Sequence, residues 1–408
     1  MVDHIAGAAP TGGYRVLSLP VLILYGAALV HGLTLVSFPA LSVVLTRGYG
    51  LTDAQYGASF LPQVACAVLG ALLGGALAAR LGLKRVLSLS LLAVAASQGL
   101  LAAIAVLPPA ATFACLLAGT AALGLGFGLS GAPLNSYPPT FFPGKAATAI
   151  VAAHTLFGVG LTAGPLLAGA LAAAGAWAGY PLLLTALAVA AAATAMAAPL
   201  PACEPRGAIT PRSLRRTPAA TPMFWVFVAI VVGYAFAEGT FSNWAMIFLR
   251  DGRGVPEATA GWGLSAFWGA LVVGRLLVSA LVSRVAPERV WTALPVLMIA
   301  AFLLLPLAAG AASGIALFAL AGLACSAFLP LSITLASRRF PDDVPWVSSM
   351  LVAALMVGIG AGSFAIGALR EALPSDTLYR LSAVYPLLVL ALAALVLWAE
   401  RGRTERRS

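Results

Sequence analysis

Charged residues are scarce in this chain of 408 residues, since only 9% are Asp, Glu, Lys or Arg while 61% are hydrophobic. A soluble domain of this length needs more charge on its surface, so the composition predicts an all-α, polytopic membrane protein. The mean hydropathy of +1.00 agrees with this class. Segments of about ten residues with alternating polarity, which a transmembrane β-barrel requires, are absent.

Cysteine is rare as well. Of the 4 cysteines, Cys66, Cys115 and Cys325 lie in apolar runs, and no two of the 4 have metal-ligand spacing. We therefore expect small apolar packing residues rather than a disulfide framework or a zinc site. A phosphate-binding Gly-x-x-x-x-Gly-Lys-Ser/Thr motif and a Ser/His/Asp set outside the membrane are also missing. The sequence thus predicts neither an enzyme nor a cofactor, and energy must come from an ion gradient or from the substrate's own gradient.

Long apolar runs are what the chain has in abundance. Runs of about 20 apolar residues can cross a bilayer as helices. The sequence predicts twelve, at residues 17–45, 54–79, 85–106, 112–138, 146–174, 178–199, 222–249, 257–283, 289–309, 312–336, 345–369 and 378–399. The first run is long and is followed by others, so we expect a retained helix rather than a signal peptide.

A segment rich in proline and arginine, residues 200–221, separates the sixth run from the seventh. We expect it to be a linker between two six-helix bundles, residues 1–199 and 222–408. This linker, every second loop and the C-terminal tail together carry the whole net charge of +10, while the other loops sum to zero. The positive-inside rule then places the linker and both termini in the cytoplasm. The membrane itself is expected to be a bacterial inner membrane, which the resemblance described below implies. The basic composition therefore reflects topology, and no nucleic-acid partner is expected.

The two halves also repeat in sequence. An offset of 204 aligns residues 53–86 with 257–290 without gaps, and an offset of 198 aligns Gly160-x-x-x-Gly164 with Gly358-x-x-x-Gly362. Two parallel repeats joined by a linker are one plan of a secondary transporter, with its binding site between the halves near the midplane. The glycine runs predict close helix contacts.

A basic motif follows the second run, Gly75-Ala-Leu-Ala-Ala79-Arg80-Leu-Gly82-Leu83-Lys84-Arg85. It resembles the signature Gly-x-x-x-Asp-Arg-x-Gly-Arg-Lys of the major facilitator superfamily, which this chain resembles over essentially its whole length. The Asp position is Ala79 here and Ser283 in the second copy, so the family's usual latch on the cytoplasmic gate is altered. The resemblance implies gating roles for the basic residues of both copies, Arg80, Lys84, Arg85, Arg284 and Arg289.

Several polar and aromatic positions, among them Pro133-Leu-Asn135-Ser-Tyr137, His154, Glu238 and Asn243-Trp244, are similar to one branch of that superfamily. That branch contains the fucose–proton symporters and their bacterial relatives. The resemblance implies alternating access, a small polar, sugar-like substrate, and a proton (or sodium) as coupling ion. The chain departs from the fucose symporters in having no carboxylate in its first or fourth run.

Glu238 is the one carboxylate outside the loops and tails. At membrane depth a carboxylate is costly unless it is protonated, paired or facing water, so it marks a functional site. It lies roughly 24 Å from the cytoplasmic end of its span, which is the extracellular half. We expect it to take up and release the coupling proton; the alternative is a permanently protonated or capped residue that fixes helix packing.

Arg275 and His31 also lie within membrane runs. Arg275 is about 12 Å from the cytoplasmic end of its span, so we do not expect it to pair with Glu238. It suits either a gating role, by binding helix-end carbonyls, or that of a bidentate receptor for a substrate carboxylate. His31 is predicted at the depth of Glu238 and titrates in a range that suits sharing its proton, with a hydrogen bond to a neighbouring helix as the alternative.

Uncharged polar and aromatic side chains complete the candidate site. Hydrogen bonding or stacking on a polyhydroxylated ligand suits these residues: Asn135, Asn243, Trp244, His154, Tyr25 and Gln63. Packing roles remain open for all of them. The leading hypothesis is a proton-coupled transporter of a small polar solute, acting as a monomer in contact with membrane lipid. The alternative is a transporter or exporter of an organic anion or drug-like compound, with Arg275 as the anion receptor.

Overall fold

The computed structural model describes residues 14–202 and 218–405, and this part of the chain contains helices but no strand. The prediction of twelve spans is confirmed, because eleven helices are long and apolar enough to cross a membrane and the first span contains the shorter apolar helix α1 (Leu19–Leu35). Most of the predicted linker, residues 203–217 with Cys203, lies outside the described residues.

The helices follow one another in two sets, one for each half of the chain. The first half contains α1, α2 (Ser37–Ala40), α3 (Asp53–Ala58), α4 (Phe60–Leu81), α5 (Leu83–Ala103), α6 (Pro109–Phe141), α7 (Ala146–Ala173) and α8 (Gly179–Ala197). The second half contains α9 (Pro222–Arg253), α10 (Glu257–Leu281), α11 (Pro287–Leu304), α12 (Ala311–Cys325), α13 (Phe328–Arg339), α14 (Val344–Arg370), α15 (Ser375–Ser382) and α16 (Val384–Glu405).

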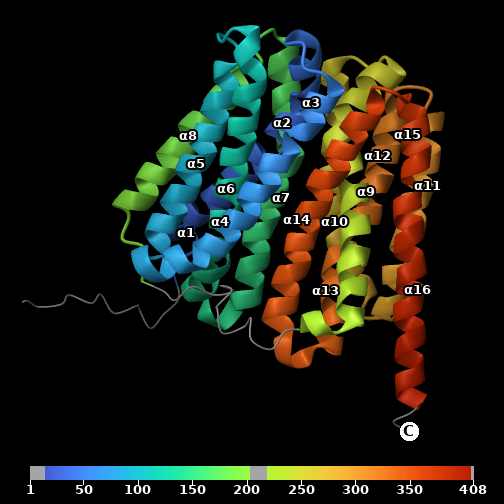
Figure 1. Cartoon of the computed structure of the whole chain (residues 1–408). Helices are drawn as coiled ribbons and strands as arrows, with labels where there is room; N and C mark the ends of the chain where they lie inside the picture. Colours follow the sequence, from blue (N-terminus) through green and yellow to red (C-terminus); the bar gives the residue numbers. More distant parts are fainter. Residues whose placement is uncertain (1–13, 203–217, 406–408) are drawn as a thin grey trace, which may run out of the picture.

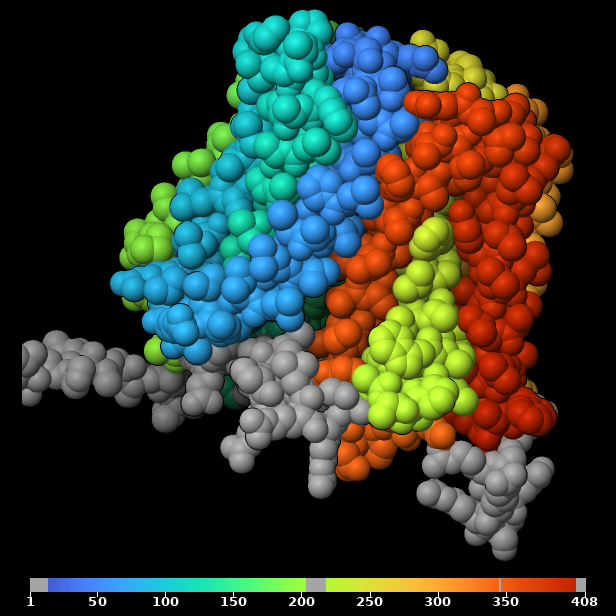
Figure 2. Space-filling model, viewed as in Figure 1, coloured from blue at the N-terminus to red at the C-terminus, as the bar shows by residue number. Residues whose placement is uncertain are grey.

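Each set packs into its own bundle, and the two bundles lie side by side (Figure 1). They meet where α7 packs against α10 and where α3 and α4 pack against α14. In the sequence repeat α4 corresponds to α10 and α7 to α14, so the two contacts are equivalent and the interface has the pseudo-symmetry of the sequence. Figure 2 shows α4 of the first bundle pressed against α14 of the second. We call the end where α8 stops and α9 starts the linker end, and the opposite end, where α14 meets α15, the ion-pair end.

Glycines allow the closest helix contacts, as the sequence predicts. On α6, a Cβ added to Gly128 would overlap the carbonyl oxygen of Ala67, and one added to Gly124 would overlap that of Gln63. The backbones of α4 and α6 therefore touch, and no side chain fits between them. Close approach of this kind is the use that membrane helices make of small residues.

Replacing Gly128 with alanine is expected to destabilise the first bundle by roughly 1–3 kcal/mol, because the added methyl group forces α4 away from α6. Gly131 of the same helix is the matched control, since a Cβ there meets nothing within 4 Å. Its change to alanine should leave stability unchanged or raise it by up to about 1 kcal/mol, the gain in helix propensity. Thermal unfolding of both purified variants in detergent measures the difference. Equal stability of the two variants would contradict the tight seam.

Candidate functional site

A cavity of about 440 Å³ lies between the bundles, bounded by α4, α6 and α7 of the first and by α14 of the second. Its walls are mostly apolar, with a small number of polar side chains that include Asn135, His154, Ser348 and Ser349. The two serines stand near the start of α14, so the cavity lies in the half of the molecule nearer the linker end. An apolar cavity with few polar groups is typical of a site for a small molecule.

Two predicted binding residues meet in this cavity. The Nε2 atom of His154 lies 3.4 Å from Oδ1 of Asn135. The Asn135 amide donates to the carbonyl oxygen of Gly131 one turn earlier, at 2.8 Å, and this bond fixes its orientation. The His154 side chain is exposed to the cavity. The cavity wall thus presents an amide and an imidazole side by side.

Glu238 lies at the midpoint of α9 and is 7% exposed. The helix continues to Arg253, beyond the predicted span, and the depth of Glu238 in the membrane stays a prediction. Tyr234 lies one turn away on the same helix, within electrostatic range of the carboxyl group. The Tyr234 hydroxyl donates to the carbonyl oxygen of Cys325 at 2.9 Å.

Cys325 belongs to a break in the tenth span, which the sequence predicted as one continuous run. Helix α12 ends at Cys325 and α13 begins at Phe328, so carbonyl groups at the break lose their intrahelical partners. Tyr234 binds the first of these carbonyls, and Nε of Arg275 binds the next, that of Ser326, at 3.0 Å. Irregular backbone at membrane depth is tolerated only where such partners satisfy it, and transporters use such breaks at their binding sites.

Arg275 joins the two groups of polar residues. Its guanidinium lies within electrostatic range of Glu238 and also of His154 across the bundle interface. The described residues contain no direct ion pair between Arg275 and Glu238, in agreement with the prediction that the two do not pair. Binding a helix-end carbonyl is the contact predicted for Arg275 as a gating residue.

His31 is not brought to Glu238. It is buried between α1 and α5, where its Nε2 lies 3.3 Å from Oγ of Ser90. The interactions of Glu238 involve Tyr234 and Arg275 instead. This placement matches the alternative interpretation of His31, a hydrogen bond to a neighbouring helix.

The other four predicted binding residues do not line the cavity. Tyr25 donates to the carbonyl oxygen of Ala149 at 3.0 Å, which ties α1 to α7. Gln63 belongs to the seam between α4 and α6. Asn243 donates to Oγ of Ser363 at 2.7 Å, and Trp244 is buried, with its ring 5.2 Å from that of Tyr56. Contacts between helices are therefore present for Tyr25, Asn243 and Trp244, and the binding roles of all four residues stay predictions.

Ion pairs between the bundles close the ion-pair end of the molecule, opposite the linker end. Arg370 of α14 donates through Nε to Asp53 of the first bundle at 2.8 Å and lies 3.5 Å from Asp251. Arg47 of the first bundle pairs with the same Asp251 at 2.5 Å. Beneath them, the Tyr56 hydroxyl donates to the carbonyl oxygen of Asn243 at 3.0 Å, again across the interface.

These residues were not predicted as functional, because their charges cancel within the loops that carry them. One signal was available. Loops with no net charge still place charges of both signs at the ends of spans, Arg47 and Asp53 in the first half and Asp251 and Arg253 in the second. Charges of opposite sign at one end of both bundles can pair between them.

The basic residues at the linker end make no such contacts. Lys84 donates to the carbonyl oxygen of Ala198 at 2.7 Å, within the first bundle. Within residues 14–202 and 218–405, the exposed side chains of the other four predicted gating residues form no hydrogen bond or ion pair: Arg80, Arg85, Arg284 and Arg289. The family's latch would need an acidic partner, and Ala79 and Ser283 stand in its place. The roles of these residues in gating stay a prediction.

Comparison with known proteins identifies the family. The family model described as Major Facilitator Superfamily matches residues 23–317 and 226–408. The chain is 30% identical over 173 residues to an uncharacterized transporter, y4wD, of Sinorhizobium fredii (strain NBRC 101917 / NGR234). This match covers 40% of the chain and 44% of that relative, so the chain spans less than half of the relative's length.

Solved structures share the fold. The nucleoside transporter NupG superposes with a TM-score of 0.74 at 16% identity, covering 93% of this chain and 99% of that one. A bacterial homologue of the human lysosomal transporter Spinster, in an inward-facing and occupied conformation, gives 0.70 at 19% identity over 95% and 98% of the two chains. The Escherichia coli fucose–proton symporter FucP gives 0.61 at 16% identity over 93% and 99%. The predicted resemblance is confirmed, and this multi-pass membrane protein belongs to the major facilitator superfamily of transporters.

Proposed function

We propose that this transporter moves a small polar, sugar-like solute by alternating access and couples the movement to protonation of Glu238. The observation that carries the proposal is the cavity between the bundles, with Asn135 and His154 in its wall and Arg275 linking it electrostatically to Glu238. Proton uptake and substrate binding would then act on neighbouring groups. The bundles of residues 1–199 and 222–408 are the two moving parts.

The closed ion-pair end supports alternating access. Arg370 and Arg47 fasten the bundles there, whereas the described residues contain no ion pair between the bundles at the linker end. With the linker end in the cytoplasm of a bacterial inner membrane, as the loop charges favour, this conformation faces inward. The structure of the Spinster homologue, which has a related fold, is also described as inward-facing.

The chemistry of the cavity supports an uncharged polar substrate. Asn135 and His154 offer neutral donors and acceptors, with the serine hydroxyls of α14 on the facing wall. Such groups match the hydroxyl groups of a sugar or the polar edge of a nucleoside. Two structural neighbours are named for a nucleoside and for fucose, which agrees with this class.

The contacts of Glu238 favour a neutral carboxyl group in this conformation. The Tyr234 phenol has one hydrogen, and this hydrogen is donated to the carbonyl oxygen of Cys325. The phenol therefore has no hydrogen left for Glu238, whose carboxyl group is buried and has no ion-pair partner among the described residues, so the neutral form costs less than the anion there. Loss of that proton would leave an anion that attracts Arg275 away from the carbonyl oxygen of Ser326. Proton release would in this way act on the break between α12 and α13.

An organic anion is the second candidate substrate, and the contacts of Arg275 favour it. Only Nε of its guanidinium makes a hydrogen bond within the described residues. The terminal nitrogens are therefore available for a carboxylate in a bidentate arrangement. His154, within electrostatic range, lines the cavity beside it.

Ligand-induced thermal stabilisation separates the two substrates. We expect sugars or nucleosides to raise the melting temperature of the purified protein, and carboxylates and lipophilic cations to leave it unchanged, at each of two pH values. His154→Ala should weaken the binding that underlies this shift by roughly five- to tenfold, the loss of one hydrogen bond. His31→Ala is the control, since His31 lies away from the cavity and should keep the shift relative to its own melting temperature. A shift with carboxylates alone, abolished by Arg275→Ala, would instead establish the organic anion.

A further inference from the structure

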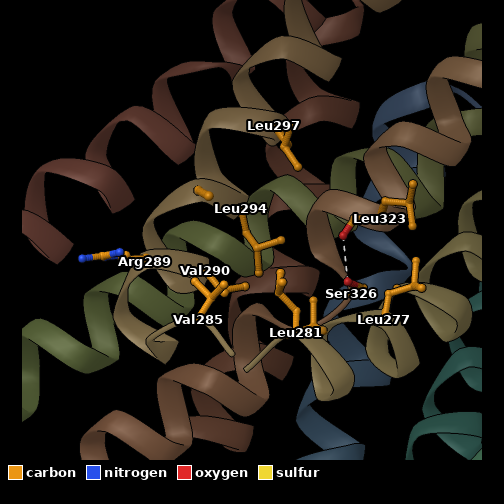
Figure 3. Close-up of a pocket in the computed structure, with 12 residues that line it drawn as sticks. Leu277, Leu281, Val285, Arg289, Val290, Leu294, Leu297, Leu323 and Ser326 are labelled. Carbon is orange, nitrogen blue, oxygen red and sulfur yellow. Dashed lines mark hydrogen bonds between the residues drawn. The ribbon is translucent and has the colours of Figure 1, made fainter. Parts of the chain in front are cut away.

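A second hollow lies on the second bundle, outside the interface between the bundles. It is an apolar groove of about 330 Å³ formed by α10, α11, α12 and the turn between α10 and α11 (Figure 3). Leu277 and Leu281 of α10 and Leu297 of α11 line it and are 59%, 44% and 40% exposed. In a membrane protein, side chains this apolar and this exposed face lipid.

Arg289 marks the linker end of the groove. Figure 3 shows its side chain at the edge, directed away from the apolar residues. The neighbouring Glu288 is paired with Arg338 at 2.6 Å, so it does not neutralise Arg289. Arg284, in the same turn, also makes no side-chain hydrogen bond or ion pair within the described residues. Glu400 is the other carboxylate near this end and interacts with Arg338, so the mouth of the apolar groove carries two arginines without a direct ion-pair partner among the described residues.

We propose that this groove binds an anionic phospholipid, with one acyl chain along the groove and the phosphate group at Arg289. From Arg289 to Leu297 the groove wall runs about 12 Å along α11, long enough for a section of an acyl chain. Lipid tails gain little free energy by moving from bilayer to protein, because both are apolar. Preference for this lipid must therefore come from the headgroup, and basic residues at the cytoplasmic surface attract anionic lipids.

The bound chain would touch the part of the fold that holds Arg275. Ser326 and Gly274 line the groove, and a Cβ on Gly274 would lie 2.5 Å from Oγ of Ser326, so α10 and the break are in direct contact. The Ser326 hydroxyl donates to the carbonyl oxygen of Leu323 at 2.7 Å, as Figure 3 shows. The carbonyl oxygen of Ser326 binds Arg275. A lipid in the groove would therefore pack against the outer side of the break between α12 and α13.

Native mass spectrometry of the full-length protein tests this site, with phosphatidylglycerol and phosphatidylcholine of the same acyl chains added in equal amounts. We expect one lipid to be retained with a preference for phosphatidylglycerol of about fivefold, the effect of one arginine near an anionic headgroup. Arg289→Gln should remove the preference. Arg85→Gln is the matched control, because Arg85 occupies the equivalent position of the first repeat and does not line the groove.

A second pair of variants tests the groove itself. Ala293 is an exposed residue of the wall, so Ala293→Trp should fill the groove and remove the retained lipid. Val296→Trp changes an exposed residue of the same helix outside the groove and should bind lipid as the unchanged protein does. Equal retention of both lipids by the unchanged protein, or a preference that survives Arg289→Gln, overturns the headgroup site. Retention that survives Ala293→Trp overturns the acyl-chain site.

Discussion

Glu238→Gln is expected to abolish accumulation of the substrate driven by a pH gradient, while substrate exchange across the membrane continues. Glutamine has nearly the same shape but cannot release a proton, so the cavity can still fill and reorient. A gradient of one pH unit is worth about 1.4 kcal/mol per proton, and tight coupling of one proton to one solute therefore supports about tenfold accumulation. The variant should accumulate no solute above the external concentration. Purified protein in liposomes, with the substrate identified by thermal stabilisation, provides both measurements.

Two controls sharpen this result. Glu257→Gln removes a carboxyl group at the start of α10, away from Glu238, and this variant should still accumulate the substrate. Tyr234→Phe keeps the Glu238 carboxyl group but removes its neighbour, so accumulation should persist with an altered pH dependence. Full accumulation by Glu238→Gln would rule out Glu238 as the coupling residue. Accumulation driven by a sodium gradient instead of a pH gradient would show that sodium, and not the proton, is the coupling ion.

The fold could be predicted from the sequence because membrane helices carry strong signals. Apolar runs must be long enough to cross the bilayer, and the backbone must satisfy its own hydrogen bonds there. The breaks were not predictable in this way. Residues 312–336 form one apolar run, yet the helix stops at Cys325. The break is tolerated because the carbonyl groups that lose their helical partners accept hydrogen bonds from Tyr234 and Arg275. Those partners come from other helices, and apolar periodicity contains no information about them.

The candidate site was predictable in part. Asn135 and His154 are polar residues on neighbouring helices, and the structure brings them together in the cavity. Asn243 and Trp244 have the same polar and aromatic character but face Ser363 and Tyr56 at the closed end. Residue type gives the chemistry of a side chain, whereas the tilt and rotation of its helix decide which surface it faces. These angles depend on packing, and here on glycine contacts.

The ion pairs between the bundles are the feature of the closed end with the largest expected effect on conformation. The Arg370 side chain is 9% exposed, and removing it leaves Asp53 and Asp251 facing each other without their shared partner. Loss of one partner of a buried charge pair costs roughly 2–5 kcal/mol. The part of this cost that comes from the ion pairs falls on the conformation in which the bundles touch at this end, whereas the contacts of Arg370 with Ser375 and the Trp244 ring lie within the second bundle. Arg370→Ala should therefore shift the population toward opening of the ion-pair end.

Distances between spin labels on the two bundles measure this shift. Val106 and Leu307 are 86% and 66% exposed at the ion-pair end, one in each bundle, and suit the labels. Arg370→Ala should move the main distance to longer values. Arg253→Ala is the matched control, because Arg253 is similarly buried, at 10% exposure, but pairs with Asp376 inside the second bundle. It should lower stability without changing the distance.

Arg47→Ala tests whether burial, and not charge alone, holds this end closed. Arg47 pairs with the same Asp251 across the interface, but its side chain is 64% exposed. Exposed pairs contribute about 0–1 kcal/mol because water screens them, so this change should shift the distance distribution little. We expect the order Arg370→Ala, then Arg47→Ala, then Arg253→Ala for the effect on opening. If Arg253→Ala opened this end as much as Arg370→Ala does, general loss of stability would explain the opening, and the ion pairs between the bundles would have no specific role in it.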